Sequence, residues 1–346
     1  MKITKQLFFA LVIFLALPRM TGAATLYFDP GAGEYGFGDT FAVDLKIDLD
    51  SSAECVNTVE GIVSFDKDYL EAVDFSTGDS ILSLWIELPK TADMPAVNNE
   101  HRLKFSGGIP GGYCGSIPGD PGDSNILGKI IFKVKDFKTD SGLTPKAKIS
   151  YLDTTRVLLN DGAGTPAALS LKEAEFSIKA ASAKARSDWE TLRAEDNIPP
   201  EPFILEIQQN PEVFDDQYYI IFSTTDKQTG VDHYEVMESE IEKPAGKKNF
   251  VDYLSDLFGR KKAEPVWQKT DARPYLLSDQ TLSSNIKVKA VDKSGNERIA
   301  EYFPKEKPGA RGFSSILLPV VVLLILVGIL AAFFLARRRA KKISSQ

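Results

Sequence analysis

The sequence is poor in the residues that build metal centres and covalent active sites. Of its 346 residues only two are cysteines and two are histidines, too few soft ligands for a zinc or iron–sulfur site. His101 and His233 have no Cys or His beside them, so neither a metal site nor a histidine-based triad is indicated, and we expect both at the surface. We therefore expect no enzyme and no resident cofactor.

Positive charge is scarce away from the ends of the chain. Residues 1–23 contain Lys2, Lys5 and Arg19, residues 337–346 contain five more basic residues, and all 48 Asp and Glu lie between these ends. The middle of the chain thus has 33 Lys and Arg and a net charge of −15. A nucleic-acid-binding protein needs a basic footprint, so nucleic acid is not an expected partner.

Residues 1–23 have the pattern of a secretory signal peptide. Lys2 and Lys5 precede an apolar run from Leu7 to Leu17, and small residues follow at 21–24. The run is too short to span a bilayer, which needs about 20 residues. We expect cleavage after Ala23 or Ala24; an uncleaved N-terminal anchor is the alternative.

Residues 316–336 are uncharged and, as a helix, would measure about 31 Å, which matches the hydrocarbon core of a bilayer. A basic cluster follows directly, formed by Arg337, Arg338, Arg339, Lys341 and Lys342. The positive-inside rule places this cluster in the cytoplasm, as a stop-transfer anchor. The sequence therefore predicts a single-pass plasma-membrane protein with its N-terminal domains outside the cell.

Alternating apolar and polar residues predict an all-β domain over residues 24–178. In 40–49, one face carries Phe41, Val43, Leu45, Ile47 and Leu49, which is typical of a half-buried strand. Comparable runs occur at 25–28, 58–65, 69–75, 80–88, 102–106, 126–135, 146–151, 155–159 and 168–178. We expect nine or ten short strands without a helix, arranged as an antiparallel sandwich.

A second β-domain is expected at 200–304, after a linker at 179–199 with one or two helical turns around Trp189. Strand signals recur at 203–209, 217–224, 231–238, 266–269, 274–277, 285–292 and 296–303. Seven strands in about 100 residues predict an immunoglobulin-like or fibronectin III-like sandwich, with a closing hairpin at 292–296. Residues 305–315 are a polar stalk. An insertion at 244–265 is expected to form a short helix on the sandwich edge; the alternative is an amphipathic loop that touches lipid headgroups.

Two glycine-rich segments carry no catalytic signature. Residues 31–36 match GxGxxG by letter, but an alternating strand follows instead of a helix, so we predict a turn rather than a dinucleotide site. Residues 106–122 lack the ending of a phosphate loop and are expected to form a flexible loop available for recognition. Asp120 and Asp123, at the end of this segment and directly after it, are a calcium candidate; turn chemistry is the favoured interpretation.

Cys55 and Cys114 are the only thiols. In an exported chain two cysteines most simply pair with each other, which would stabilise the fold by roughly 4 kcal/mol and fix the glycine-rich loop to the strand near Val56. Two free thiols or pairing to another chain are the alternatives.

Residues 24–178 resemble the cohesin domain. The resemblance rests on Val-Glu-Gly-Ile-Val-Ser-Phe-Asp at 59–66, Leu-Glu-Ala-Val-Asp at 70–74, Gly107-Gly108 after the strand at 103–105, and Gly-Lys-Ile-Ile-Phe-Lys-Val at 128–134. It implies a nine-stranded jelly-roll sandwich, related in fold to carbohydrate-binding modules, that binds dockerins on other proteins. The cysteine pair and the glycine- and proline-rich loop depart from the family pattern.

Residues 199–304 resemble a bacterial Ig-like or fibronectin III-like module. The matching pieces are Pro-Pro-Glu-Pro-Phe at 199–203, Gly-Val-Asp-His-Tyr-Glu-Val at 230–236 and Val-Lys-Ala-Val-Asp-Lys-Ser-Gly-Asn at 288–296. The resemblance implies a spacer.

Together these features predict a membrane-anchored cell-surface protein that captures an extracellular, dockerin-like protein without a covalent step. Trp85, Ile109 and Tyr113 are the ligand-binding candidates, because aromatic anchors dominate interface energetics; Trp85 is otherwise a core residue and Tyr113 otherwise covers the disulfide. The first alternative is a carbohydrate-binding surface protein linked to polysaccharide binding or degradation, which requires a row of exposed aromatic side chains. The second alternative is a purely structural surface module.

Overall fold

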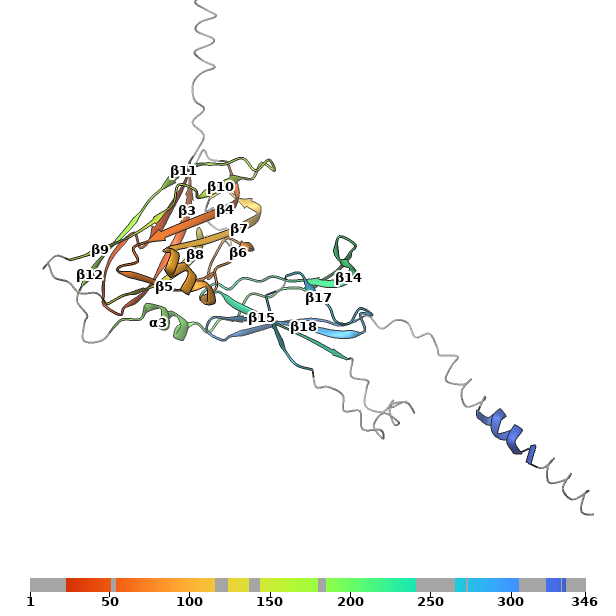
Figure 1. The fold of residues 1–346 in the computed structure, drawn as a ribbon. Coiled ribbons are helices and arrows are strands. Elements are labelled where there is room, and N and C mark those ends of the chain that lie inside the picture. The colour runs from red at the N-terminus through yellow and green to blue at the C-terminus, as the bar shows by residue number, and fades with distance from the viewer. Residues whose placement is uncertain are drawn as a thin grey trace, which may run out of the picture. The chain divides into compact units, whose positions relative to one another are not determined.

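The computed structural model describes residues 23–50, 54–115, 124–136, 144–179, 185–240, 265–271, 273–304, 322–330 and 332–333. The chain divides into two compact units, Met1–Tyr302 and Phe303–Gln346, which are described separately (Figure 1). In the second unit, 322–330 and 332–333 are helical. None of the helices in the described ranges is long and apolar enough to cross a membrane. Residues 1–22 of the predicted signal peptide, the insertion up to residue 264, the stalk, residues 316–321, 331 and 334–336 of the apolar span and the basic tail lie outside the described residues.

The first unit begins with two sheets that form the first sandwich (residues 23–179). One sheet has the order β11 (Ala168–Leu171), β1 (Ala23–Asp29), β3 (Thr40–Leu49), β8 (Ile126–Val134), β5 (Leu70–Ser76). The other has the order β2 (Ala32–Gly36), β12 (Ala174–Lys179), β9 (Lys146–Tyr151), β4 (Val56–Phe65), β7 (Arg102–Tyr113), β6 (Leu84–Glu87), and β10 (Arg156–Leu159) also pairs with β4. The predicted sandwich is confirmed, but not as wholly antiparallel, because β1 pairs with β11, and β2 with β12, in parallel.

The core between these sheets is built by the predicted alternation. On β3, Phe41, Val43, Leu45 and Ile47 are at most 1% exposed, which stabilises the sandwich by removing apolar surface from water. Large rings from both sheets fill the same core, among them Phe75, Phe105, Phe132 and Phe176. Gly128 must lack a side chain, because an added Cβ would overlap the ring of Phe75.

Two glycine-rich predictions are wrong. Residues 32–36 are strand β2 rather than a turn, because they pair in parallel with β12; the turn comes after them, at residues 37–38. Residues 106–113 continue strand β7 rather than form a loop, with Gly107 and Gly108 paired to both β4 and β6. Cross-strand partners on both sides thus override the weak strand propensity of glycine. The rest of the predicted loop, residues 116–123, lies outside the described residues.

The expectation of no helix in the first sandwich is also wrong. A 3-10 turn, η1 (Thr91–Asp93), leads into the short helix α2 (Met94–Glu100). The helix buries Met94, and the Asn98 side chain both accepts from the Ala72 N–H and donates to the Ala72 carbonyl, at 2.8 Å each. A helix of two turns held by such tertiary contacts shows no helical periodicity in its sequence.

The linker and the second sandwich (residues 200–304) follow the predicted order. The expected helical turns around Trp189 are helix α3 (Asp188–Glu195), which is capped by Ser187 and buries Trp189. The three-stranded sheet is β13 (Glu206–Asn210), β14 (Val213–Ile221), β17 (Tyr275–Leu276), and the four-stranded sheet is β16 (Gln268–Thr270), β15 (Val231–Glu240), β18 (Ser284–Asp292), β19 (Glu297–Tyr302). Residues of both sheets share one core, including Ile220 and Val288. The hairpin at 292–296 is confirmed; the Ig-like or fibronectin III-like identity stays a prediction.

One carboxylate organises the turn before β18. Burial alone would raise the pKa of Asp279, but hydrogen bonds from the Thr281 and Ser284 hydroxyls and from the Thr281 and Ser283 N–H groups outweigh it and hold the pKa well below its usual range. The charged form of Asp279 therefore stabilises this turn.

Candidate functional site

The outward side of strands β6, β7, β4 and β10 forms a flat surface, here called the outer face. The strand register places Leu84 opposite Gly108, Gly108 opposite Thr58, and Thr58 opposite Leu158. These four residues make one row across four strands. Gly108 has no side chain, and the Leu84 side chain lies beside its backbone.

Strand β6 lies at the edge of its sheet and carries the most exposed aliphatic residues of the first sandwich. Leu84 is 60% exposed and Ile86 is 73% exposed. The register shifts between Trp85 and Glu87, which leaves Ile86 outside the ladder. Edge strands with unpaired backbone groups and exposed apolar side chains are ready surfaces for another chain.

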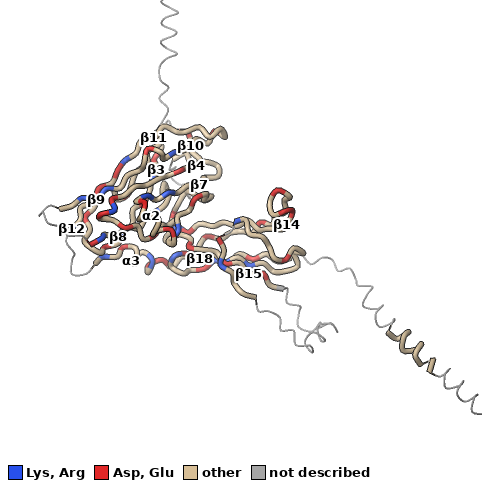
Figure 2. The backbone as a smooth tube through the Cα atoms, in the orientation of Figure 1, with Lys and Arg blue, Asp and Glu red and all other residues tan. Residues whose placement is uncertain are grey.

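Charged residues border the row formed by Leu84, Gly108, Thr58 and Leu158. Glu60 of β4 pairs with Arg156 of β10, with 2.5 Å between Oε2 and Nη2, and Arg102 and Lys104 of β7 are exposed on the same strand. Figure 2 shows acidic and basic residues interspersed along the described strands of the first sandwich. The outer face thus combines exposed aliphatic side chains on β6 with charged residues on β4, β7 and β10.

The disulfide predicted between Cys55 and Cys114 is present and joins the start of β4 to the end of β7. Nearby, the Asn160 side chain donates to the Gly111 carbonyl at 3.1 Å and accepts from Asn57 Nδ2 at 3.2 Å. One end of the outer face is therefore held by a covalent bond and two side-chain hydrogen bonds.

The three predicted ligand-binding residues lie on the inner side of these strands. Trp85 is half-buried and makes an edge contact with Phe75, with 5.9 Å between ring centroids. Ile109 is half-buried against the core and Tyr113 is 8% exposed. The sequence analysis missed Leu84, Ile86 and Leu158; the signal was present in Leu-Trp-Ile at 84–86, where apolar residues occupy both faces of a short strand.

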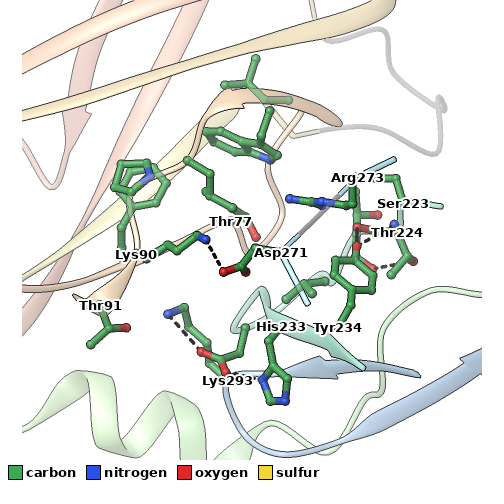
Figure 3. Close-up of a pocket in the computed structure, with 18 of the residues that line it drawn as sticks. Thr77, Lys90, Thr91, Ser223, Thr224, His233, Tyr234, Asp271, Arg273 and Lys293 are labelled. Carbon is green, nitrogen blue, oxygen red and sulfur yellow. Dashed lines mark hydrogen bonds and ion pairs between the residues drawn. The ribbon is translucent and has the colours of Figure 1, made fainter. Parts of the chain in front are cut away.

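A cavity of about 300 Å³ lies beside Trp85, lined by residues 75–92 of the first sandwich and by residues of the second. Figure 3 shows Lys90 and Asp271 facing each other there, with 2.7 Å between Nζ and Oδ2. The hydrogen bond from Lys90 holds the pKa of Asp271 below its usual range, against the effect of burial. Lys293, also at the cavity, bonds to both oxygens of Asp74, at 2.8 and 3.0 Å. These charges pair across the contact between the sandwiches, as structural ion pairs do.

The two histidines are less exposed than predicted. The His233 side chain is 17% exposed, and its Nδ1 lies 2.6 Å from Asp232 Oδ2. His101 is half-buried, and its Nδ1 has no hydrogen-bond partner among the described residues. His233 lines the cavity, and its ring nitrogens lie near the carboxylates of Asp232 and Glu235. Neither carboxylate is a nucleophile that an imidazole activates.

A group of carboxylates that could hold a metal ion lies at the second sandwich and not at the outer face. Among the described residues, Asp196, Asp226 and Asp292 are close enough to share an ion. The calcium candidates named from the sequence, Asp120 and Asp123, lie outside the described residues.

No family model and no curated protein matches the chain. Solved structures that are similar include a type I cohesin–dockerin complex from Clostridium thermocellum (16% identity, 46% of this chain, 95% of that chain, TM-score 0.34). A non-cellulosomal cohesin from Archaeoglobus fulgidus is similar too (15% identity, 51% and 99% covered, TM-score 0.32), as is the cohesin module of a Clostridium perfringens family 33 glycoside hydrolase (15% identity, 46% and 98% covered, TM-score 0.31).

Proposed function

We propose that this chain is a membrane-anchored cell-surface protein whose first sandwich captures a protein ligand non-covalently. The ligand class is dockerin-like, as the cohesin resemblance of the sequence implies, and the second sandwich serves as a spacer. The proposed role needs no cofactor and no covalent step.

The observation that carries the proposal is the exposed aliphatic pair on edge strand β6. Leu84 and Ile86 are 60% and 73% exposed, while Trp85 between them is held against Phe75. A rigid strand that presents apolar side chains to solvent loses little conformational entropy when a partner covers them. Protein association is the function that uses such a surface most directly.

The same surface disfavours the carbohydrate alternative. Sugar binding by stacking requires exposed aromatic rings. In the described part of the first sandwich the large exposed apolar residues are Leu84 and Ile86, both aliphatic, and the nearest ring, Trp85, is half-buried. The outer face therefore fits a protein better than a polysaccharide.

Membrane anchoring is proposed from the sequence of residues 316–336 and the basic cluster after them. The described helical residues of this segment agree with the proposal in one respect: Leu323, Leu324 and Ile325 are 57–64% exposed. Side chains of this kind are stable when lipid covers them.

The test uses immobilised, oxidised residues 24–302 and the extracellular fraction of the source organism, with protein and glycan read by mass spectrometry. We expect recovery of a protein with duplicated calcium-loop repeats, and loss of at least about tenfold in its affinity in Leu84→Ser/Ile86→Ser, since central apolar contacts are worth about 1–2 kcal/mol each.

Ile204→Ser is the matched control, because Ile204 of the second sandwich is also 73% exposed. This variant should bind as the wild type does. Equal binding by the double variant, or capture of glycan alone, would show that the outer face is not the binding surface we propose.

A further inference from the structure

Three aspartate side chains meet in the second sandwich, each from a different segment of the chain. Asp196 follows helix α3, Asp226 lies between β14 and β15, and Asp292 ends β18. They are 6%, 1% and 2% exposed, and each contributes a carboxylate oxygen to a group whose members all lie within 4.8 Å of one another. Three buried carboxylates at this distance repel one another strongly unless something compensates their charge.

The carboxylates are positioned by the backbone of their own segments. Oδ1 of Asp226 accepts hydrogen bonds from the N–H groups of Gln228 and Gly230, at 3.0 and 2.8 Å. Oδ1 of Asp292 accepts from the N–H of Asn296 at 2.8 Å. These oxygens are fixed by the fold itself, so the arrangement is preorganised for a ligand.

Asp226 gives the separate indication that a ligand belongs here. Its Oδ2 atom is buried and has no hydrogen-bond partner among the described residues, although a buried carboxylate oxygen is costly when unpaired. The ion pairs of the described Lys, Arg and His residues include none of the three aspartates.

We propose that Asp196, Asp226 and Asp292 bind a divalent cation of the Ca²⁺ class. The available donors are oxygens, which hard cations prefer and which do not suit zinc or copper sites rich in nitrogen and sulfur. Ca²⁺ accepts six to eight oxygen ligands in flexible geometry, whereas Mg²⁺ requires a near-ideal octahedron. A bound Ca²⁺ neutralises two of the three buried charges and gives Oδ2 of Asp226 its partner.

The ion would order the segment through which the second sandwich contacts the first. The Asp226 carbonyl accepts from the Asp79 N–H at 3.0 Å, and the Thr229 carbonyl accepts from the Ser76 hydroxyl at 2.6 Å. Thr229 also donates its hydroxyl to Asp196 Oδ2 at 2.5 Å. The cation site is therefore part of the contact between the sandwiches, and the inference does not rest on the proposed ligand-binding function.

The test measures Ca²⁺ binding and thermal unfolding of the full chain after metal is removed with EDTA. CaCl₂ alone is titrated by calorimetry, and the unfolding midpoint is recorded with and without CaCl₂, with MgCl₂ as the comparison. We expect Ca²⁺ to raise the midpoint of the wild type more than Mg²⁺ does. Asp226→Asn should weaken Ca²⁺ binding at this site by at least about tenfold and abolish most of the rise.

Asp215→Asn is the matched control, because Asp215 is an exposed aspartate of the same sandwich; it should bind Ca²⁺ as the wild type does. If Asp226→Asn does not fold, Asp196→Asn replaces it. Equal Ca²⁺ affinity in wild type and variant would overturn the proposal, since the ion would then bind elsewhere. A wild-type midpoint that CaCl₂ leaves unchanged would overturn it as well, without reference to any variant.

Discussion

The ion pair between Asp74 and Lys293 links the two sandwiches, and its removal is predicted to lower the free energy of unfolding measurably. Lys293 Nζ lies 2.8 and 3.0 Å from the two oxygens of Asp74. The two side chains are only 9% and 13% exposed, so solvent screens them little. Asp74 also accepts from the Thr91 hydroxyl at 2.7 Å, which positions its carboxylate for the lysine.

Lys293→Met keeps an unbranched side chain, one atom shorter, but removes its charge, and it leaves Asp74 buried without the lysine as counter-charge. Breaking one partner of a buried pair costs about 3–5 kcal/mol, and we expect about 3 kcal/mol here because both groups keep some contact with water. Asp74→Asn should cost a similar amount. The double variant should lose about as much as either single variant, since the second change removes the unpaired charge that the first one created.

The assay is equilibrium urea unfolding of residues 24–302. The free energy of unfolding is extrapolated to water for the wild type, the two single variants and the double variant, which together form a double-mutant cycle. The matched control is Lys146→Met, because Lys146 and Glu175 form a pair that is 61% and 54% exposed and should contribute no more than about 1 kcal/mol. A coupling energy between Asp74 and Lys293 below about 0.5 kcal/mol, or a loss in Lys146→Met as large as that in Lys293→Met, would refute the reasoning.

Three further changes test other parts of the fold. Cys55→Ser/Cys114→Ser should lower the free energy of unfolding by about 4 kcal/mol, because the bridge closes a loop of 59 residues in the unfolded chain. Gly128→Ala should cost roughly 1–3 kcal/mol, since its Cβ would overlap Phe75. Asp279→Asn should destabilise the protein at pH 7, and its difference from the wild type should shrink as the pH falls below about 4, because the lowered pKa of Asp279 makes the charged form the stabilising one.

Each of these has a control in the same urea assay. The wild type in dithiothreitol should match the double serine variant. Gly31→Ala should be nearly neutral, because an added Cβ there meets its nearest atom at 3.5 Å. Asp215→Asn should leave the pH profile unchanged. An Asp279→Asn difference that is constant from pH 7 to pH 3 would contradict the assigned pKa direction.

Local patterns were sufficient wherever a strand buries one face. The alternation at 40–49 predicts β3 with its bounds, since period-two burial follows from strand geometry. The seven strand signals after residue 200 each correspond to a strand. The two cysteines predict their own bridge because only one pairing is possible within the chain.

Local patterns failed where partner strands decide conformation. The sequence predicts a loop at Gly107 and Gly108, but these residues lie between β4 and β6, which supply hydrogen-bond partners on both sides. The binding candidates failed for a related reason. Trp85 is the aromatic residue of its segment and is therefore a predicted binding residue. In the structure its side chain packs against Phe75, while Leu84 and Ile86 are exposed.

The sequence by itself determined that the chain forms two β-sandwiches. Hydrophobic periodicity and turn residues act over short distances, and two cysteines allow only one pairing within the chain. Only the tertiary structure decided which side chains share a site. Asp196, Asp226 and Asp292 are spread over nearly 100 residues, and no spacing rule relates them. They meet because the end of α3, the β14–β15 connection and the end of β18 lie together in the fold. Burial then makes their charges energetically unfavourable, which is not so for exposed aspartates.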